Sequence, residues 1–182
     1  MNVGVISTRY AKAMLAYAME HGEEDVIYCN MSQLLHTLHE IRQLPTVLQD
    51  PSLSQDERVS IICEAAKGSS PLFGKFARLV VKEEREELLL FIAHAFVSLY
   101  REEKNILAVE LTTAVPIDDR LREKVTGMFS GSYNAVELDN IVDPSIIGGF
   151  VCESASKRLD ASVAGQLRDI RKHLVKQNRK LV

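Results

Sequence analysis

The sequence predicts a mainly α-helical protein of the α+β class, with an N-terminal six-helix bundle followed by a small C-terminal β-α-β-β-α domain. Two observations support this prediction. Through residue 105, apolar residues recur at helical spacing in segments separated by glycine- and proline-containing turns. From Ile106 onward the period changes, and apolar residues alternate with polar or small ones, as they do in strands. We therefore expect two domains, 1–105 and 106–182.

The composition is that of an ordinary globular protein. Of 182 residues, 46% are hydrophobic and 26% charged, and the formal net charge is −3. These values exclude collagen-like, low-complexity and disulfide-scaffold classes. The three cysteines are far apart and form no C-x-x-C pair, so we expect reduced thiols and neither a disulfide nor a zinc site. The longest apolar run, Leu88 to Tyr100, is too short to span a bilayer.

Turn signals divide the helical half. Gly22 closes the first helix, and Ser54 with Glu57 three residues later forms a capping box that opens the fourth. The segment from Leu88 to Tyr100 is apolar almost all round, which predicts a central, buried helix. The glutamate-rich run 83–87 before it is expected to be a solvated turn. The expected helices cover residues 7–20, 25–42, a short turn at 47–48, a stretch after Ser54, 73–81 and 88–100.

The C-terminal half alternates between strand and helix patterns. Strands are expected at 106–115, at 136–142 and after Ile147, and helices at 118–129 and 162–177. We expect the last helix to pack its apolar stripe on the sheet; the stripe consists of Val163, Leu167, Ile170 and Leu174. Basic residues cluster near its end: Arg168, Arg171, Lys172, Lys176, Arg179 and Lys180, against Asp169. Such a cluster suits nucleic acid or anionic lipid, but a solvated face or a protein partner is favoured in a domain so near neutrality.

Motifs for catalysis are missing from the sequence. It contains no phosphate-binding P-loop and no Gly-x-Ser-x-Gly, and Gly148-Gly149 lacks dinucleotide-binding spacing and indicates a bulge or a close strand approach instead. His36 and His39 share a helical face, but a metal site needs further ligands, and only Glu40 is adjacent in sequence. We therefore expect no catalytic residue, no cofactor and no metal.

The first helix has more apolar surface than one packing face requires. Tyr10, Ala13, Met14 and Tyr17 lie at positions i, i+3, i+4 and i+7 and therefore share a face. Ordinary bundle packing is one interpretation of this face. The other is a groove for a partner helix, where the small side chain of Ala13 would permit close approach.

Four segments stand out in order along nearly the whole chain: 9–14; 48–54 with Glu57; 76–81 with Arg85, Leu88, Ile92, Phe96 and Leu99; and 147–151 with 159–163 and Leu167. Together they resemble the delta subunit of bacterial F-type ATP synthase, a family that includes the mitochondrial oligomycin-sensitivity-conferring protein. The first segment is similar to the family's opening helix, the second to the junction of helices three and four, the third to helices five and six, and the fourth to the C-terminal signature. Two positions depart from the family pattern: Glu83-Glu84 stands for the usual Asn-Gly, and Ala161 for the glycine of Asp-Gly-Ser.

The resemblance implies a non-catalytic stator subunit. Domain 1–105 would hold the N-terminal helix of an alpha subunit between its first and fifth helices, and we assign to that site Tyr10, Ala13, Met14, Tyr17, Phe76 and Leu79. Domain 106–182 would meet the b subunits of the peripheral stalk, and we assign to that contact Arg168, Arg171 and Lys172. The protein would lie on the cytoplasmic face of the bacterial inner membrane, attached only through the complex, and would bind no nucleic acid.

The residues alone leave two other functions open. One is a small cytosolic enzyme with an unrecognised site in 106–182, and the other is a basic-tailed nucleic-acid-binding module. The order of the four segments favours the stator subunit over both.

Overall fold

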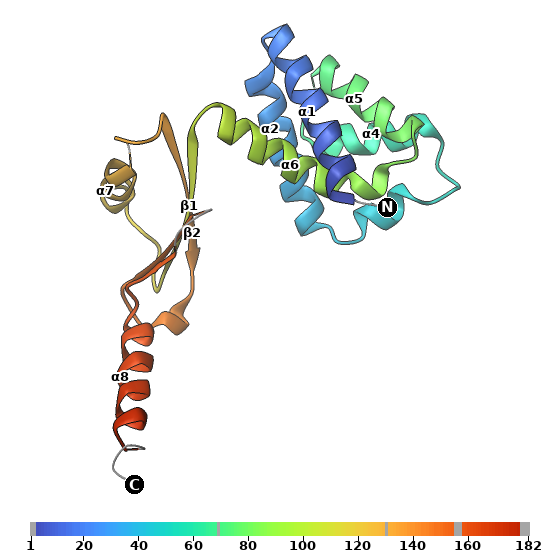
Figure 1. The fold of residues 1–182 in the computed structure, drawn as a ribbon. Coiled ribbons are helices and arrows are strands. Elements are labelled where there is room, and N and C mark those ends of the chain that lie inside the picture. The colour runs from blue at the N-terminus through green and yellow to red at the C-terminus, as the bar shows by residue number, and fades with distance from the viewer. Residues whose placement is uncertain (1–2, 69, 130, 155–157, 179–182) are drawn as a thin grey trace. The chain divides into compact units, whose positions relative to one another are not determined.

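The computed structural model describes residues 3–68, 70–129, 131–154 and 158–178, with side chains described as far as 173. The chain divides into two compact units, Met1–Glu103 and Lys104–Val182, and each contains buried apolar residues of its own. The first unit is helical and the second contains a small mixed sheet (Figure 1). The α+β class predicted from the sequence is confirmed.

The helical unit is organised around its last helix. Its elements are α1 (Val3–His21), α2 (Glu24–Glu40), α3 (Leu44–Leu48), α4 (Gln55–Ala65), α5 (Pro71–Lys82), a 3-10 turn η1 (Glu86–Leu88) and α6 (Leu89–Glu103). Helix α6 packs against α1 and α2, and α4 packs against α5. Ile92, Ala93 and Phe96 of α6 are completely buried. The central position expected for this apolar segment is therefore observed, although Phe91 on its outer side is half exposed.

Hydrogen bonds at two helix starts place α4 and α5. The capping box predicted at Ser54 is present, with the Glu57 amide donating to Ser54 Oγ and Glu57 accepting from the Ser54 amide. These hydrogen bonds from Ser54 hold the pKa of Glu57 below its usual value. Asn30, buried in α2, donates to the Gly68 carbonyl and accepts from the Ser70 amide. Since Ser70 caps α5, Asn30 ties the start of α5 to α2.

The turn between α5 and α6 differs from the solvated loop expected at 83–87. Glu86 is only 5% exposed, and its carboxylate lies 3.2 Å from the guanidinium of Arg58 in α4. Arg58 also donates to the Asp50 carbonyl, 3.1 Å away. A run of charged residues resembles a solvated turn in sequence, and the partly buried cation that pairs with one of them, Arg58, comes from a distant element.

The second unit consists of a small sheet and two helices. Its elements are β1 (Ile106–Thr113), α7 (Asp119–Phe129), β2 (Ala135–Val142), a 3-10 turn η2 (Pro144–Ile146), β3 (Phe150–Ser154), β4 (Arg158–Asp160) and α8 (Val163–Asn178). Among the described residues the strand order is β2-β1-β3-β4, with β1 parallel to β2 and antiparallel to β3. Strand β4 was not predicted, because three residues carry too short a pattern to show a period.

The turn from β4 into α8 explains why position 149 needs a glycine and why position 161 does not. Gly149 has a φ of +74°, and a Cβ on it would collide with the carbonyl oxygen of Ala161, so the Gly-Gly pair serves close backbone approach, as expected. The family's second glycine is not needed at Ala161, whose φ is not positive. Asp160 instead accepts from the amide and hydroxyl of Ser162, and Ser162 caps α8 by accepting from the Gly165 amide.

Candidate functional site

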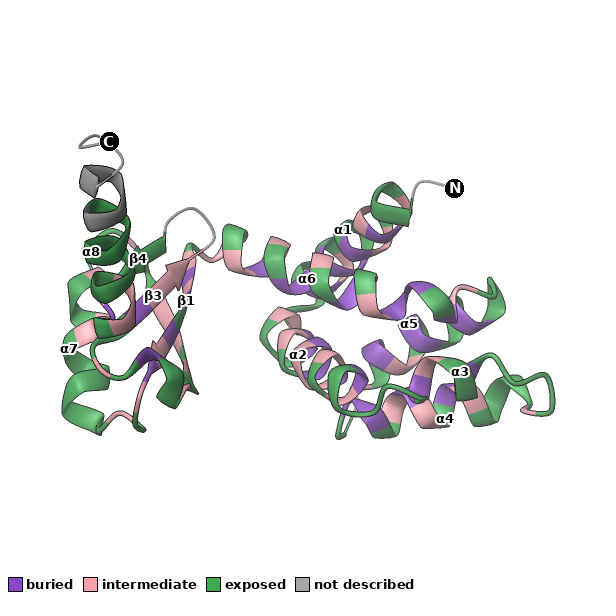
Figure 2. Cartoon of the chain, turned by 90° about the horizontal axis from the view of Figure 1, so that it is seen from below, coloured by how far each residue is buried: buried purple, intermediate pink, exposed green. Residues whose placement is uncertain are grey.

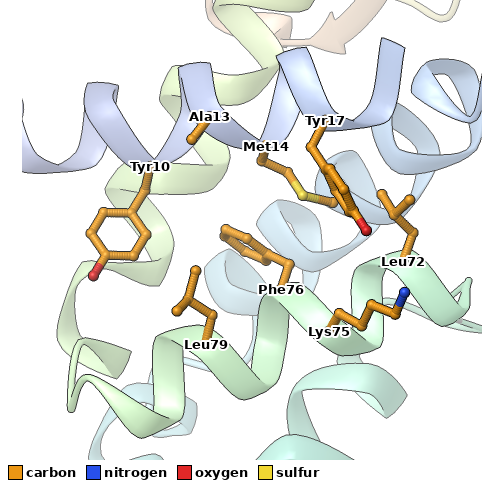
Figure 3. A pocket seen from close by; sticks show the side chains of 8 residues that line it. All are labelled: Tyr10, Ala13, Met14, Tyr17, Leu72, Lys75, Phe76 and Leu79. Carbon is orange, nitrogen blue, oxygen red and sulfur yellow. The ribbon is translucent and has the colours of Figure 1, made fainter. Parts of the chain in front are cut away.

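A groove runs between α1 and α5 on the helical unit. Its volume is about 340 Å³. Figure 3 shows side chains from the two helices pointing toward one another across it. The lining residues are Tyr10, Ala13, Met14, Tyr17, Leu72, Lys75, Phe76 and Leu79. The structure thus brings together all six groove residues named from the sequence.

Helix α1 has one face that packs in the bundle and a second face that lines the groove. One is buried against the bundle and consists of Ser7, Ala11, Met14, Leu15 and Ala18. Because Ala11 and Ala18 are small and completely buried, α6 can approach α1 closely. The other face lies about 110° away around the helix axis and carries Tyr10, Ala13 and Tyr17. Ala13 is exposed, so it is not part of the bundle core.

The groove has a buried apolar floor and an accessible rim. Met14 and Phe76 are 4% and 6% exposed and form the floor. Leu79 is 47% exposed and stands on the rim, and Tyr10 and Tyr17 are half-buried. Apolar side chains that remain accessible around a concave, apolar floor are typical of a binding site for an amphipathic helix.

Sequence reasoning missed two lining residues, Leu72 and Lys75. With Phe76 and Leu79 they occupy positions i, i+3, i+4 and i+7 of α5, so helical spacing could have found them. Leu72 was not assigned to the groove because the fifth helix was expected to begin at Phe73, whereas Pro71 is its first residue. Lys75 was not among the residues assigned to the groove, although it precedes Phe76 directly.

Helix α8 carries the residues assigned to the stalk, but it does not pack as expected. Arg168, Arg171 and Lys172 are exposed. The apolar stripe is exposed as well, with Val163 at 39%, Leu167 at 54% and Ile170 at 57%, and the side chain of Leu174 lies outside the described residues. The prediction that this stripe packs on the sheet is therefore wrong for its described members.

The start of α8 explains this result. The Val163 amide donates to the Gly148 carbonyl, which attaches the first turn of α8 to the loop after η2. The helix contacts η2 and continues away from the end of the sheet (Figure 1). Its apolar stripe is therefore left without a cover within the described part of the unit.

The sheet and α7 leave a second apolar pocket of about 260 Å³. Leu111 and Phe150 contribute from the sheet, Leu121 and Met128 from α7. No described residue of α7 is buried, as its green and pink ribbon shows in Figure 2. Cys152 lies in the pocket, and burial raises the pKa of its thiol, so this thiol stays protonated at neutral pH.

In the helical unit, His39 of α2 lies against His94 of α6. The two Nε2 atoms are 3.3 Å apart. Partial burial lowers the pKa of His94, and the neighbouring His39 lowers it further. His36, which shares a helical face with His39 in sequence, instead lies 3.3 Å from the carboxylate of Glu40.

Comparison with known proteins settles the family. A model of the family described as ATP synthase delta (OSCP) subunit matches residues 6–174. The chain belongs to this family. It is 41% identical to the ATP synthase subunit delta of Bacteroides fragilis over the full length of both proteins, and 33% identical to that of Lactobacillus acidophilus over 95% of this chain and 96% of the relative.

The fold is similar as well. A chain in the cryo-EM structure of the Toxoplasma gondii mitochondrial ATP synthase hexamer superposes with a TM-score of 0.68 and 19% identity, covering 93% of this chain and 97% of that one. The resemblance recognised from four sequence segments is thereby confirmed.

As a member of the ATP synthase delta (OSCP) family, the chain is a non-catalytic, peripheral-stalk subunit of F-type ATP synthase. Its work is therefore done by interfaces, and the α1–α5 groove and the exposed surface of α8 are the candidate interfaces. None of the helices described is long and apolar enough to cross a bilayer.

Proposed function

We propose that the groove between α1 and α5 binds an amphipathic N-terminal helix of the alpha subunit, and that the second unit binds the b subunits. The observation that carries the first part is the shape of the groove, in which a buried floor of Met14 and Phe76 is flanked by accessible apolar side chains. Such a surface suits a helix that inserts one apolar face and leaves its polar face in water.

The dimensions of the groove favour a helix of a few turns. Tyr10 and Tyr17 are two turns apart, which is about 10 Å along α1. Ala13 lies between them (Figure 3), so the partner backbone can come close at this point. Lys75 gives the lining a positive charge near Tyr17, and an acidic side chain or the carboxyl end of the partner helix would complement it.

The stalk interface combines the apolar stripe of α8 with its basic residues. Leu167 and Ile170 are more than half exposed, and burying them against a partner would supply affinity. Arg168, Arg171 and Lys172 are exposed beside them, and charges of one sign chiefly accelerate association with a partner of opposite charge.

Two such interfaces would make the chain a mechanical tie. Rotation of the central shaft exerts torque on the alpha/beta head, and the head must be held relative to the membrane sector for proton flow to drive ATP synthesis. A tie of this kind requires interface area, of about 1,200–2,000 Å² at each contact for a stable complex. It would lie on the cytoplasmic side of the bacterial inner membrane.

The groove assignment is tested by placing a charge in the lining of the groove. Ala13→Asp would bury a carboxylate under the partner helix at a cost of several kcal/mol. Because about 1.4 kcal/mol corresponds to a tenfold change in affinity, binding of a peptide with the alpha N-terminal sequence should fall by about 100-fold or more. The measurement is a peptide titration beside a thermal melt.

Ala16→Asp is the matched control. Ala16 is an exposed alanine of the same helix and lies outside the groove lining. The control should bind the peptide like the parent chain, and both variants should melt like it. Unchanged binding by Ala13→Asp would refute the groove assignment.

A further inference from the structure

Two histidines from different helices form a pair on the surface of the helical unit. His39 lies in the last turn of α2 and His94 in the middle of α6. Their rings are nearly perpendicular, at 83°, with centroids 5.5 Å apart. Both residues are exposed. Because α2 and α6 pack against each other, the helix packing itself holds the two imidazoles together.

We propose that His39 and His94 form a binding site for a divalent first-row transition-metal ion, with water completing its coordination. Neutral imidazole nitrogen is a preferred ligand of Zn²⁺, Cu²⁺ and Ni²⁺. Two nitrogens bound to one ion at roughly 2.0–2.1 Å lie about 3.3 Å apart in a tetrahedral arrangement and about 2.9 Å apart at a right angle. The two Nε2 atoms are 3.3 Å apart, within hydrogen-bonding distance in the free protein, and this separation is also the one that two ligands of a tetrahedral ion require.

The neighbours of the pair define what kind of site it is. Among the described residues, no group of three histidine, cysteine, aspartate or glutamate side chains is arranged to hold a metal. His36 is engaged with Glu40. The ion would therefore have two protein ligands and open positions, which makes it exchangeable rather than a permanent part of the fold.

A bound ion would link α2 to α6. The ligands are far apart in the chain, so an unfolded chain cannot offer them together. An ion that binds only the folded state stabilises it by mass action, increasingly with ion concentration. The site would thus couple metal availability to the stability of the helix on which α1 packs, independently of the groove.

Calorimetric titration with Ni²⁺ tests the proposal on the full chain, without a polyhistidine tag. Ni²⁺ is chosen because Zn²⁺ has a stronger preference for thiolates, and Cys29 is exposed. We expect one ion per chain and a rise of a few degrees in the melting temperature of the helical unit. Both effects should disappear in His39→Gln and in His94→Gln.

His36→Gln is the control, since it removes an exposed histidine of the same helix that is outside the pair. It should keep the stoichiometry and the thermal shift. Absence of binding at millimolar Ni²⁺, or loss of binding in His36→Gln as well, would overturn the proposal. Electron paramagnetic resonance of bound Cu²⁺ gives a second measurement: coupling to two imidazole nitrogens supports the site, and coupling to one contradicts it.

Discussion

Glu84 occupies a backbone conformation that suits glycine better. It has a φ of +53° and follows the C-cap of α5. The Glu84 amide donates to the Val81 carbonyl and the Arg85 amide to the Val80 carbonyl, which is the Schellman pattern of helix termination. The break between α5 and α6 is therefore retained, although Glu83-Glu84 replaces the Asn-Gly typical of the family.

Glu84→Gly should stabilise the helical unit. A side chain in the left-handed region costs about 1–2 kcal/mol, and glycine's greater freedom in the unfolded chain offsets part of the gain, so we expect about 0.5–1 kcal/mol in urea unfolding. Glu83→Gly is the control, because Glu83 has a φ of −88° and gains nothing from glycine. Equal effects at the two positions would show that the left-handed conformation is not strained.

Glu86 has the opposite character to its exposed neighbours. Its carboxylate pairs with Arg58 at 3.2 Å in a mostly buried setting. Glu86→Ala would leave the guanidinium without this partner, and a buried polar group left unsatisfied costs about 1–3 kcal/mol. Urea unfolding should show that loss, whereas Glu87→Ala, at an exposed position, should stay within about 0.5 kcal/mol of the parent. A solvated Glu86 would instead make the two variants alike.

At the scale of the element, α1 and α8 differ in how much of their apolar surface the unit covers. Helix α1 buries one face and shares Met14 with a groove, so its second face lines the site where we propose that a partner helix binds. Helix α8 contacts η2 and leaves Leu167 and Ile170 exposed. An uncovered stripe of this size is typical of an interaction surface.

Charge reversal on α8 separates steering from apolar affinity. Replacing Arg168, Arg171 and Lys172 with Glu should slow association with the b subunits at low salt. Charges that no longer complement those of the partner act mainly on the association rate. Since all three are exposed, the helical content by circular dichroism should not change. The difference from the parent should shrink as salt rises. An association rate that is unchanged at every salt concentration would assign these residues to solvated surface.

At the scale of the whole molecule, a stator subunit matters only when its contacts are made at the same time. Vesicles carrying the synthase with Ala13→Asp should still hydrolyse ATP, because the chain contributes no catalytic group. Their ATP-driven proton pumping should fall, because a head that is not held turns without transmitting torque. Hydrolysis and fluorescence-quench assays on the same vesicles measure the two rates.

Ala16→Asp again serves as control and should pump like the parent. Coupled pumping by the Ala13→Asp synthase, combined with lost binding of the isolated peptide, would mean that other contacts suffice to hold the head. Loss of ATP hydrolysis by the Ala13→Asp synthase would instead contradict the non-catalytic role of this chain.

The sequence by itself determined what depends on neighbours along the chain. Helical spacing placed Tyr10, Ala13, Met14 and Tyr17 on one face, the capping box at Ser54 marked the start of α4, and the change of period at Ile106 marked the first strand. The family, and the expected groove between the first and fifth helices, were inferred from the resemblance of four ordered segments to a known family. The spacing of neighbouring residues does not carry this information.

Only the tertiary structure decided which distant residues meet. Arg58 and Glu86, or His39 and His94, are each separated by many residues, and no local pattern distinguishes a charge that is paired across the fold from one that is solvated. The course of α8 was decided in the same way, by a hydrogen bond from Val163 to Gly148. Amphipathic spacing shows that a helix has an apolar face, but the packing of the other elements determines whether that face is covered.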